Sequence, residues 1–184
     1  MKNKISNHIE NHLKVIKNNF NEINDCIYEI TKIIKKTYKN KNTFFLAGNG
    51  GSASDCEHIA GELVGRFKKK RKPYKAISLT TDTSVITCIA NDFGYEKIFE
   101  RQLEANGRKG DLLLVMSTSG KSKNIINALK IAKRKKINTI ALLGNNGGYC
   151  NNIADYSYIV PSNNTAVIQE VHHLIGHSFC NLLD

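Results

Sequence analysis

Four hydroxyl side chains are gathered in one six-residue segment between an apolar run and a helical stretch. They belong to Ser117, Thr118, Ser119 and Ser122. The free N–H groups and the dipole at the start of a helix favour an anion, and the hydroxyls can donate further hydrogen bonds to it. The segment therefore predicts a site for a phosphomonoester that needs no magnesium. The alternative is ordinary capping of the helix, but a cap requires only one hydroxyl.

A glycine-rich loop, Gly48–Ser52, has the same position relative to another apolar run and helical stretch. Its three glycines let the backbone approach a ligand closely and expose N–H groups to it. The loop is not the G-x-G-x-x-G fingerprint of dinucleotide-binding proteins, and no Lys-Ser or Lys-Thr pair follows it as in a P-loop. It predicts a second ligand-binding loop, with a simple tight turn as the alternative.

Groups suited to proton transfer or metal binding lie on two of the helical stretches. His58 and Glu62 are four residues apart and share a helix face, as do Gln169, His173 and His177. The first pair could supply two metal ligands, a base with its partner, or only a surface hydrogen bond. For any single histidine of the second set, a half-buried place on the flank of a helix is the alternative.

Five short apolar runs alternate with helical stretches. The runs cover residues 43–47, 75–79, 111–116, 137–143 and 156–160, and the clearest helical stretches cover 55–66, 123–135 and 165–182. This alternation predicts an α/β fold with a parallel sheet that is covered on both faces. Ligands bind at the carboxyl ends of the strands in such sheets, so both loops are expected at one edge.

The first forty residues carry a narrow apolar stripe with steps of three and four. It consists of Ile9, Leu13, Ile16, Phe20, Ile23, Ile27, Ile30 and Ile34. The spacing predicts one long helix or two shorter ones. A stripe this narrow on so long a segment favours packing against another subunit. The segment lacks a recognisable helix-turn-helix, which argues against a transcription regulator.

The chain has 184 residues and a net charge of +11, and its composition is that of a globular domain. The N-terminal segment has no signal-peptide pattern and no apolar run could span a membrane, so a cytoplasmic protein is expected. The five scattered cysteines are expected to be small buried hydrophobes in a reducing compartment. The basic run Lys68–Lys72 has no interleaved aromatic residues, which favours a solvated loop over a nucleic-acid patch.

Four strings of residues, taken together, resemble the phosphoheptose isomerases of the sugar isomerase (SIS) family. They are Gly48-Asn49-Gly50-Gly51-Ser52, Asn91-Asp92-Phe93-Gly94, Ser117-Thr118-Ser119-Gly120-x-Ser122 and Gln169-Glu170-x-His172. The resemblance covers the whole chain. It implies a single SIS domain with a five-stranded parallel sheet at 41–184 and a helical extension for oligomerisation at 1–40. It also implies a homotetramer whose active site is shared between subunits.

The resemblance also implies a role for individual residues. Substrate-binding positions are Asn49, Gly50, Gly51, Ser52, Glu62, Arg66, Asn91, Asp92, Ser117, Thr118, Ser119, Ser122 and Gln169. The ligands of one zinc ion are His58, Glu62, Gln169 and His177, and Glu62 and His177 are also the catalytic base and acid. By spacing alone, His173 is a better partner for His177, since Gln169 lies about 12 Å from His177 along the helix axis. A site shared between subunits would relax this difficulty.

The implied reaction converts sedoheptulose 7-phosphate to D-glycero-D-manno-heptose 7-phosphate, for the heptose of lipopolysaccharide or capsule. The alternative is a non-catalytic SIS protein that associates with a replication initiator. Such a protein has no use for Glu62, Gln169 and His177 as a set, which favours the enzyme. No membrane partner is expected, and a nucleic-acid partner is disfavoured. Ala166 departs from the family pattern, which has an acidic residue three positions before the glutamine.

Overall fold

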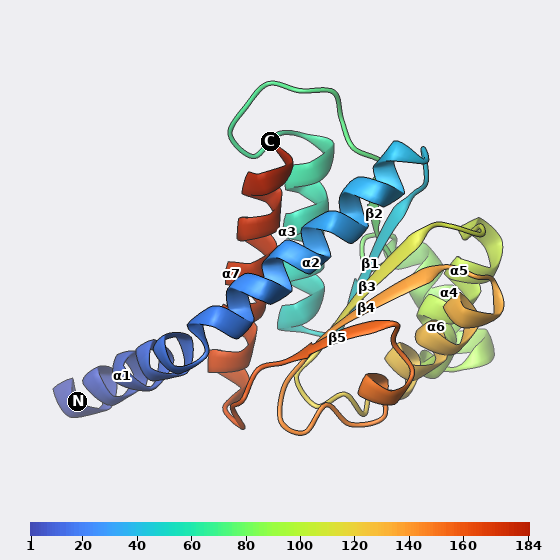
Figure 1. Cartoon of the computed structure of the whole chain (residues 1–184). Coiled ribbons are helices and arrows are strands. Elements are labelled where there is room, and N and C mark those ends of the chain that lie inside the picture. Colours follow the sequence, from blue (N-terminus) through green and yellow to red (C-terminus); the bar gives the residue numbers. More distant parts are fainter.

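The computed structural model describes residues 1–184 and contains one sheet of five parallel strands (Figure 1). The strands are β1 (Phe44–Gly48), β2 (Ala76–Ser78), β3 (Leu112–Ser117), β4 (Asn138–Leu143) and β5 (Tyr156–Ile159). Their order in the sheet is β2-β1-β3-β4-β5, and every neighbouring pair is parallel. All five predicted strands and the α/β fold class are confirmed. The central strands β1 and β3 are buried along their whole length, as expected when helices cover both faces.

The chain forms seven α-helices. They are α1 (Lys2–Asn18), α2 (Phe20–Lys39), α3 (Gly51–Val64), α4 (Thr83–Phe93), α5 (Ile98–Asn106), α6 (Lys123–Arg134) and α7 (Thr165–Leu183). Helices α2, α3 and α7 pack on one face, and α4, α5 and α6 lie on the other side of the sheet (Figure 1). The predicted helices following the two loops and at the C-terminal end are confirmed. Helices α4 and α5, which complete the crossover from β2 to β3, do not stand out as helical stretches in the sequence.

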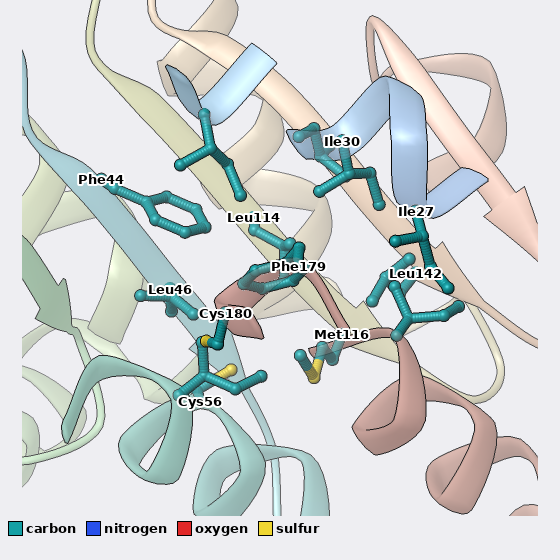
Figure 2. Close-up of a cluster of buried hydrophobic side chains, with 14 of the residues drawn as sticks. Ile27, Ile30, Phe44, Leu46, Cys56, Leu114, Met116, Leu142, Phe179 and Cys180 are labelled. Carbon is teal, nitrogen blue, oxygen red and sulfur yellow. The ribbon is translucent and has the colours of Figure 1, made fainter. Parts of the chain in front are cut away.

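The larger core lies between the sheet and the α2, α3 and α7 layer (Figure 2). Alternate strand residues such as Phe44, Leu46 and Leu114 face these helices and meet Phe179 of α7, all with no exposed surface. The intervening residues, such as Phe45, join the core of the opposite face. Each large side chain buried in this way stabilises the fold by about 1.5–3 kcal/mol. This packing fixes α3 and α7 against each other.

The N-terminal stripe forms two helices rather than one. The break is at Asn19, whose side-chain amide donates to the Val15 carbonyl oxygen over 2.8 Å. From Ile23 to Ile34 the part of the stripe on α2 is buried within the chain's own core, whereas Phe20 at the start of α2 is 60% exposed. Helix α1 buries no residue and projects away from the body of the molecule (Figure 1).

Two expectations about surface and core need adjustment. Four cysteines are buried, but Cys88 is exposed on the outer face of α4. The interpretation as a buried hydrophobe is therefore wrong for this residue.

The basic run forms a loop as predicted, but Arg71 is held in place there. Its Nε donates to Asp184 over 2.7 Å, and its other two nitrogens donate to the carbonyl oxygens of Glu62 and Leu63. None of the helices has the length and apolar character that a membrane span requires.

Candidate active site at the carboxyl edge of the sheet

The two loops singled out in the sequence leave adjacent strands, β1 and β3, at the same edge and are joined by a pair of amides. The side-chain nitrogen of Asn49 donates to Asn124 Oδ1 over 3.0 Å, and Asn124 Nδ2 donates back to Asn49 Oδ1 over 2.8 Å. The Tyr95 hydroxyl donates to the same Asn49 oxygen over 3.0 Å. The glycine-rich loop is therefore tied to the start of α6, which follows the hydroxyl loop.

Sequence reasoning misses Asn124 and Tyr95. Asn124 is only 2% exposed, and its oxygen also accepts a hydrogen bond from the Ile125 N–H. The available signal is an amide in the first turn of a helix that directly follows four hydroxyls. For Tyr95, the signal is its place immediately after the Asn91–Gly94 string.

The hydroxyl loop, residues 117–122, leads directly into the start of α6. Ser117 Oγ accepts from the Gly120 N–H over 3.1 Å, and Ser119 Oγ accepts from the Lys121 N–H over 3.2 Å. Ser122 occupies the N-cap position of α6, yet its side chain makes no capping hydrogen bond. The capping alternative thus does not account for Ser122, and its hydroxyl is available to a ligand.

A polar hollow of about 390 Å³ adjoins this loop and contains no carboxylate. It is lined by Ser119, Lys121, Asn145, Asn146 and Asn163. The Asn145 amide donates to the Thr118 carbonyl oxygen over 2.8 Å. This hydrogen bond holds the segment after β4 against the hydroxyl loop. One lysine with one hydroxyl and three amides, and no acid, is an environment that favours a phosphate group.

The acid–base residues meet where α3 and α7 run side by side. Gly176 of α7 permits this approach, because a Cβ there would be 2.4 Å from the Cδ1 atom of Ile59. His58 Nε2 lies 2.9 Å from His177 Nε2 and 3.4 Å from Glu62 Oε1. The structure thus brings three of the four predicted metal ligands together.

The third imidazole beside them belongs to His173. One ring nitrogen from each of His58, His173 and His177 lies within 4.8 Å of the others, so the three residues could hold a metal ion. The Nδ1 atom of His173 is 2.8 Å from Asp55 Oδ1, and sequence reasoning misses Asp55. An acidic residue one turn before His58 on the same helix is the signal that could have identified it.

Gln169 lies nearer the N-terminal end of α7 than the two histidines of the cluster on that helix. Its amide rests on the start of α3, since a Cβ on Gly51 would be 2.7 Å from Gln169 Nε2. Gly51 and His58 are seven residues apart, which corresponds to about 10 Å along the axis of α3. The glutamine amide thus faces the glycine-rich loop, one helical turn before His173.

Burial disfavours the charged form of His177 in this cluster. The pKa of His177 is lowered by burial first and then by the neighbouring His173 and His58. Neutral imidazoles carry the lone pair that a metal needs. His172 is different, because burial lowers its pKa to about 4 and its Nε2 atom is 3.0 Å from the Leu143 carbonyl oxygen. His172 therefore joins α7 to β4 and does not face the cluster.

The remaining predicted residues lie apart from the histidines. Asn91 and Asp92 are exposed at the end of α4, where the Asn91 amide donates to Asp92 Oδ1 over 2.8 Å. Arg66 is exposed just beyond α3. Ala166, at the departure from the family pattern, is exposed in the first turn of α7, and its N–H donates to the Asn164 cap.

Known proteins resemble this chain along its length. The sequence profile of the SIS domain matches residues 7–144. A phosphoheptose isomerase from Aliarcobacter butzleri is 45% identical over 184 residues, 100% of this chain and 97% of that protein. Phosphoheptose isomerase 2 from Campylobacter jejuni is 53% identical over 149 residues, 81% of this chain and 74% of that protein. The solved structure of a phosphoheptose isomerase from Neisseria gonorrhoeae has a TM-score of 0.94 at 33% identity, covering 100% of this chain and 98% of that chain.

Proposed function

This chain belongs to the phosphoheptose isomerases of the SIS family, and we propose that it converts sedoheptulose 7-phosphate to D-glycero-D-manno-heptose 7-phosphate. The observation that carries the proposal is the meeting of Glu62 with His177 and His58 on helices that lead from the same sheet edge as a phosphate-type loop. A carboxylate and a histidine can move the two protons of an aldose–ketose isomerisation. In a cytoplasmic setting the product would supply the heptose of lipopolysaccharide or capsule.

The substrate is held at its phosphate end by the hydroxyl loop. Ser117, Thr118, Ser119 and Ser122 donate hydrogen bonds to the phosphate, supported by the start of α6. The glycine-rich loop, through Asn49, Gly50, Gly51 and Ser52, approaches the sugar chain. Gln169 faces this loop, and Arg66, Asn91 and Asp92 complete the contacts to the sugar.

The proton transfers need a base at carbon and an acid–base group at oxygen. Glu62 removes a proton from C1 of the ketose and returns it to C2. His177 donates a proton to the oxygen on C2 and takes one from the oxygen on C1, so no proton is gained or lost overall. A histidine suits this exchange near neutral pH.

Zinc fits the donor set beside Glu62, because neutral imidazoles and a carboxylate are its usual nitrogen and oxygen ligands. The ligands that the family resemblance names are His58, Glu62, Gln169 and His177, with one ion in each active site. The chemistry that zinc supplies in such a site is polarisation of a carbonyl oxygen.

Two further features belong to the proposal. The exposed apolar side chains of α1, including Ile9 and Leu13, support a homotetramer in which the active site is shared between subunits. The non-catalytic alternative is disfavoured, since the relatives named above are isomerases and a binding module needs no carboxylate beside clustered histidines.

The direct test is incubation with sedoheptulose 7-phosphate while NMR follows the appearance of the aldose. The wild-type protein should form the heptose 7-phosphate, and a preparation treated with a zinc chelator should form it more slowly. Absence of the aldose with metal-loaded protein would contradict the proposed reaction.

A further inference from the structure

Glu62 lies in the last turn of α3, the part of a helix that is held least firmly. The helix ends at Val64, and the last four carbonyl groups of a helix have no N–H partner within it. The Gly65 N–H donates to the Gly61 carbonyl oxygen over 2.8 Å, but no backbone N–H continues the helical pattern to Glu62 or Leu63. Helix ends fray, so this turn needs donors from elsewhere if the Glu62 side chain is to stay in place.

The guanidinium group of Arg71 supplies these donors. Its Nη2 atom donates to the Glu62 carbonyl oxygen over 2.9 Å, and its Nη1 atom donates to that of Leu63 over 2.8 Å. The Arg71 side chain is only 11% exposed, so water competes little for these hydrogen bonds. Its positive charge is also favourable at the C-terminal end of a helix. The backbone of the turn that carries Glu62 is thus fixed by a residue of the following loop.

Asp184, which follows α7, orients Arg71. One carboxylate oxygen accepts from Arg71 Nε over 2.7 Å, and the other accepts from the N–H groups of Lys68 and Lys69. The Asp184 side chain is 2% exposed, and a buried charge is tolerated only when it is paired and hydrogen-bonded in this way. The bonds to Lys68 and Lys69 fold the loop so that Arg71 returns to the end of α3. We call this pair, with its hydrogen bonds, the Asp184 clamp.

The clamp joins the ends of the two helices that carry the acid–base residues, and the loop after α3 passes beside the end of α7 (Figure 1). The Arg71 guanidinium lies over the Tyr74 ring, 4.4 Å from its centroid, and the Tyr74 hydroxyl donates to the Leu183 carbonyl oxygen over 3.0 Å. Phe67, directly before the N–H groups held by Asp184, has its ring centroid 5.5 Å from that of His177.

We propose that Arg71, oriented by Asp184, is a positioning residue for Glu62. The inference rests on the proposed role of Glu62 as the base. Arg71 acts through the backbone of α3 and donates to three acceptors on two elements, which the planar guanidinium fork allows and a lysine does not. Position matters for the reaction, because a displacement of about 1 Å can cost about 10²-fold in rate.

The kinetic test compares Arg71→Met with Lys70→Met, which removes the same charge from an exposed side chain of the same loop. Rates are expressed per folded protein, from urea unfolding, so that a loss of stability alone does not register. The kcat of Arg71→Met should fall by about 10–100-fold. Its KM should stay within about threefold of wild type, because the proposed phosphate contacts come from the hydroxyl loop. Lys70→Met should keep both values within about twofold.

Two further variants test the geometry of the pair. Arg71→Lys keeps the charge but not the fork, so its kcat should fall by at least about tenfold. It also replaces Arg71→Met if that variant does not fold. Asp184→Asn should lower kcat in the wild type but add little to the loss in Arg71→Met, because residues of one network are not additive. Wild-type kcat in folded Arg71→Met or Arg71→Lys would overturn the proposal.

Amide hydrogen exchange gives a readout that does not depend on isomerase activity. The N–H groups of Gly65 and Tyr74 donate to the Gly61 and Leu63 carbonyl oxygens at the end of α3. Their protection should fall at least about tenfold in Arg71→Met and stay unchanged in Lys70→Met. Unchanged protection in Arg71→Met would overturn the proposal. A wild-type protein inactive on sedoheptulose 7-phosphate would contradict the proposed function, and the exchange result would still decide whether Arg71 holds the end of α3.

Discussion

At the scale of single residues, the chemistry depends on Glu62. Its carboxylate is 24% exposed and lies 3.4 Å from His58, so it is open to a substrate and placed beside the imidazoles. Glu62→Gln keeps the size and the hydrogen-bonding capacity of the side chain but cannot accept the carbon-bound proton. We expect turnover to fall by about 10²–10⁴-fold, the usual contribution of a positioned acid–base group. The measurement is the rate of aldose formation by NMR.

Glu57 provides the control for that experiment. It lies on the same helix, is exposed, and accepts a hydrogen bond from Thr80 away from the histidines. Glu57→Gln should keep turnover close to that of wild type. Folding of both variants is checked by circular dichroism, and near-normal turnover of folded Glu62→Gln would remove Glu62 from the mechanism.

A second residue-scale prediction concerns pH and the Asp184 clamp. Hydrogen bonds from the Lys68 and Lys69 N–H groups and from Arg71 lower the pKa of Asp184 to about 2, with the Lys68 contact the largest cause. A carboxyl whose pKa is lower in the folded state stabilises the fold above its unfolded pKa of about 4. That stabilisation is lost as pH falls from about 4 towards 2.

The measurement is urea unfolding of wild type and Asp184→Asn between pH 2 and pH 7. The variant should be less stable than wild type at pH 7, and the difference should shrink as pH falls towards 2. A difference in stability that does not change with pH would show that the charge of Asp184 is not responsible.

The sequence could predict many site residues because their signals are local. The hydroxyls of one loop lie within six residues, and His58 and Glu62 are one helical turn apart. Asn124 and Asp55 could not be identified in this way, since their partners Asn49 and His173 are 75 and 118 residues away. Only the packing of the folded chain brings such pairs together.

At the scale of elements, the strands were predictable because strands buried on both faces are continuous apolar runs. Helices α2 and α6 were predictable from their apolar stripes. Helix α4 combines Val85, Ile86 and Ile89 with two threonines, and only Ile89 is buried, so its pattern is weak. The break at Asn19 coincides with a side-chain hydrogen bond to the Val15 carbonyl oxygen, which periodicity does not reveal.

The turn at the end of the hydroxyl loop leads to the third prediction. Gly120 has φ +61°, and a Cβ at this position would be 1.9 Å from the Gly147 carbonyl oxygen. Gly120→Ala combines left-handed strain of about 1–2 kcal/mol with overpacking of about 1–3 kcal/mol. We expect a loss of more than about 2 kcal/mol in the free energy of unfolding, together with weaker substrate binding because the loop must shift.

Gly61 is the matched control for this substitution. It lies inside α3, where an added Cβ would meet nothing within 4 Å, so Gly61→Ala should stabilise the protein by about 0.5–1 kcal/mol. Both variants are compared by urea unfolding and by the KM for sedoheptulose 7-phosphate. Equal stability of Gly120→Ala and wild type would mean that the turn can relax without cost.

At the scale of the whole molecule, α1 is the helix that contributes no buried residue to the chain's own core. It contacts the body through Val15 and Ile16, which pack half-buried against the larger core, and through Glu170 of α7, whose carboxylate oxygens lie 3.5 Å from His8 Nε2 and 2.6 Å from His12 Nδ1. The apolar side chains nearer its N-terminus are left open, with Ile9 52% exposed and Leu13 45% exposed. The sequence stripe predicted a partner surface, and the structure leaves the outer half of that stripe uncovered.

The final prediction follows from this uncovered half. Burying these side chains between subunits would contribute about 1.5–3 kcal/mol each, so we expect a tetramer at micromolar concentration. Replacing Ile9 and Leu13 together with aspartate should give smaller species in light scattering, because charges would enter the apolar interface. Asn11→Asp adds the same charge to an exposed polar position of α1 and should leave the assembly intact. If the active site is shared between subunits, the double variant should also lose activity in proportion to its dissociation. A monomeric wild-type protein with full activity would contradict both the assembly and the shared site.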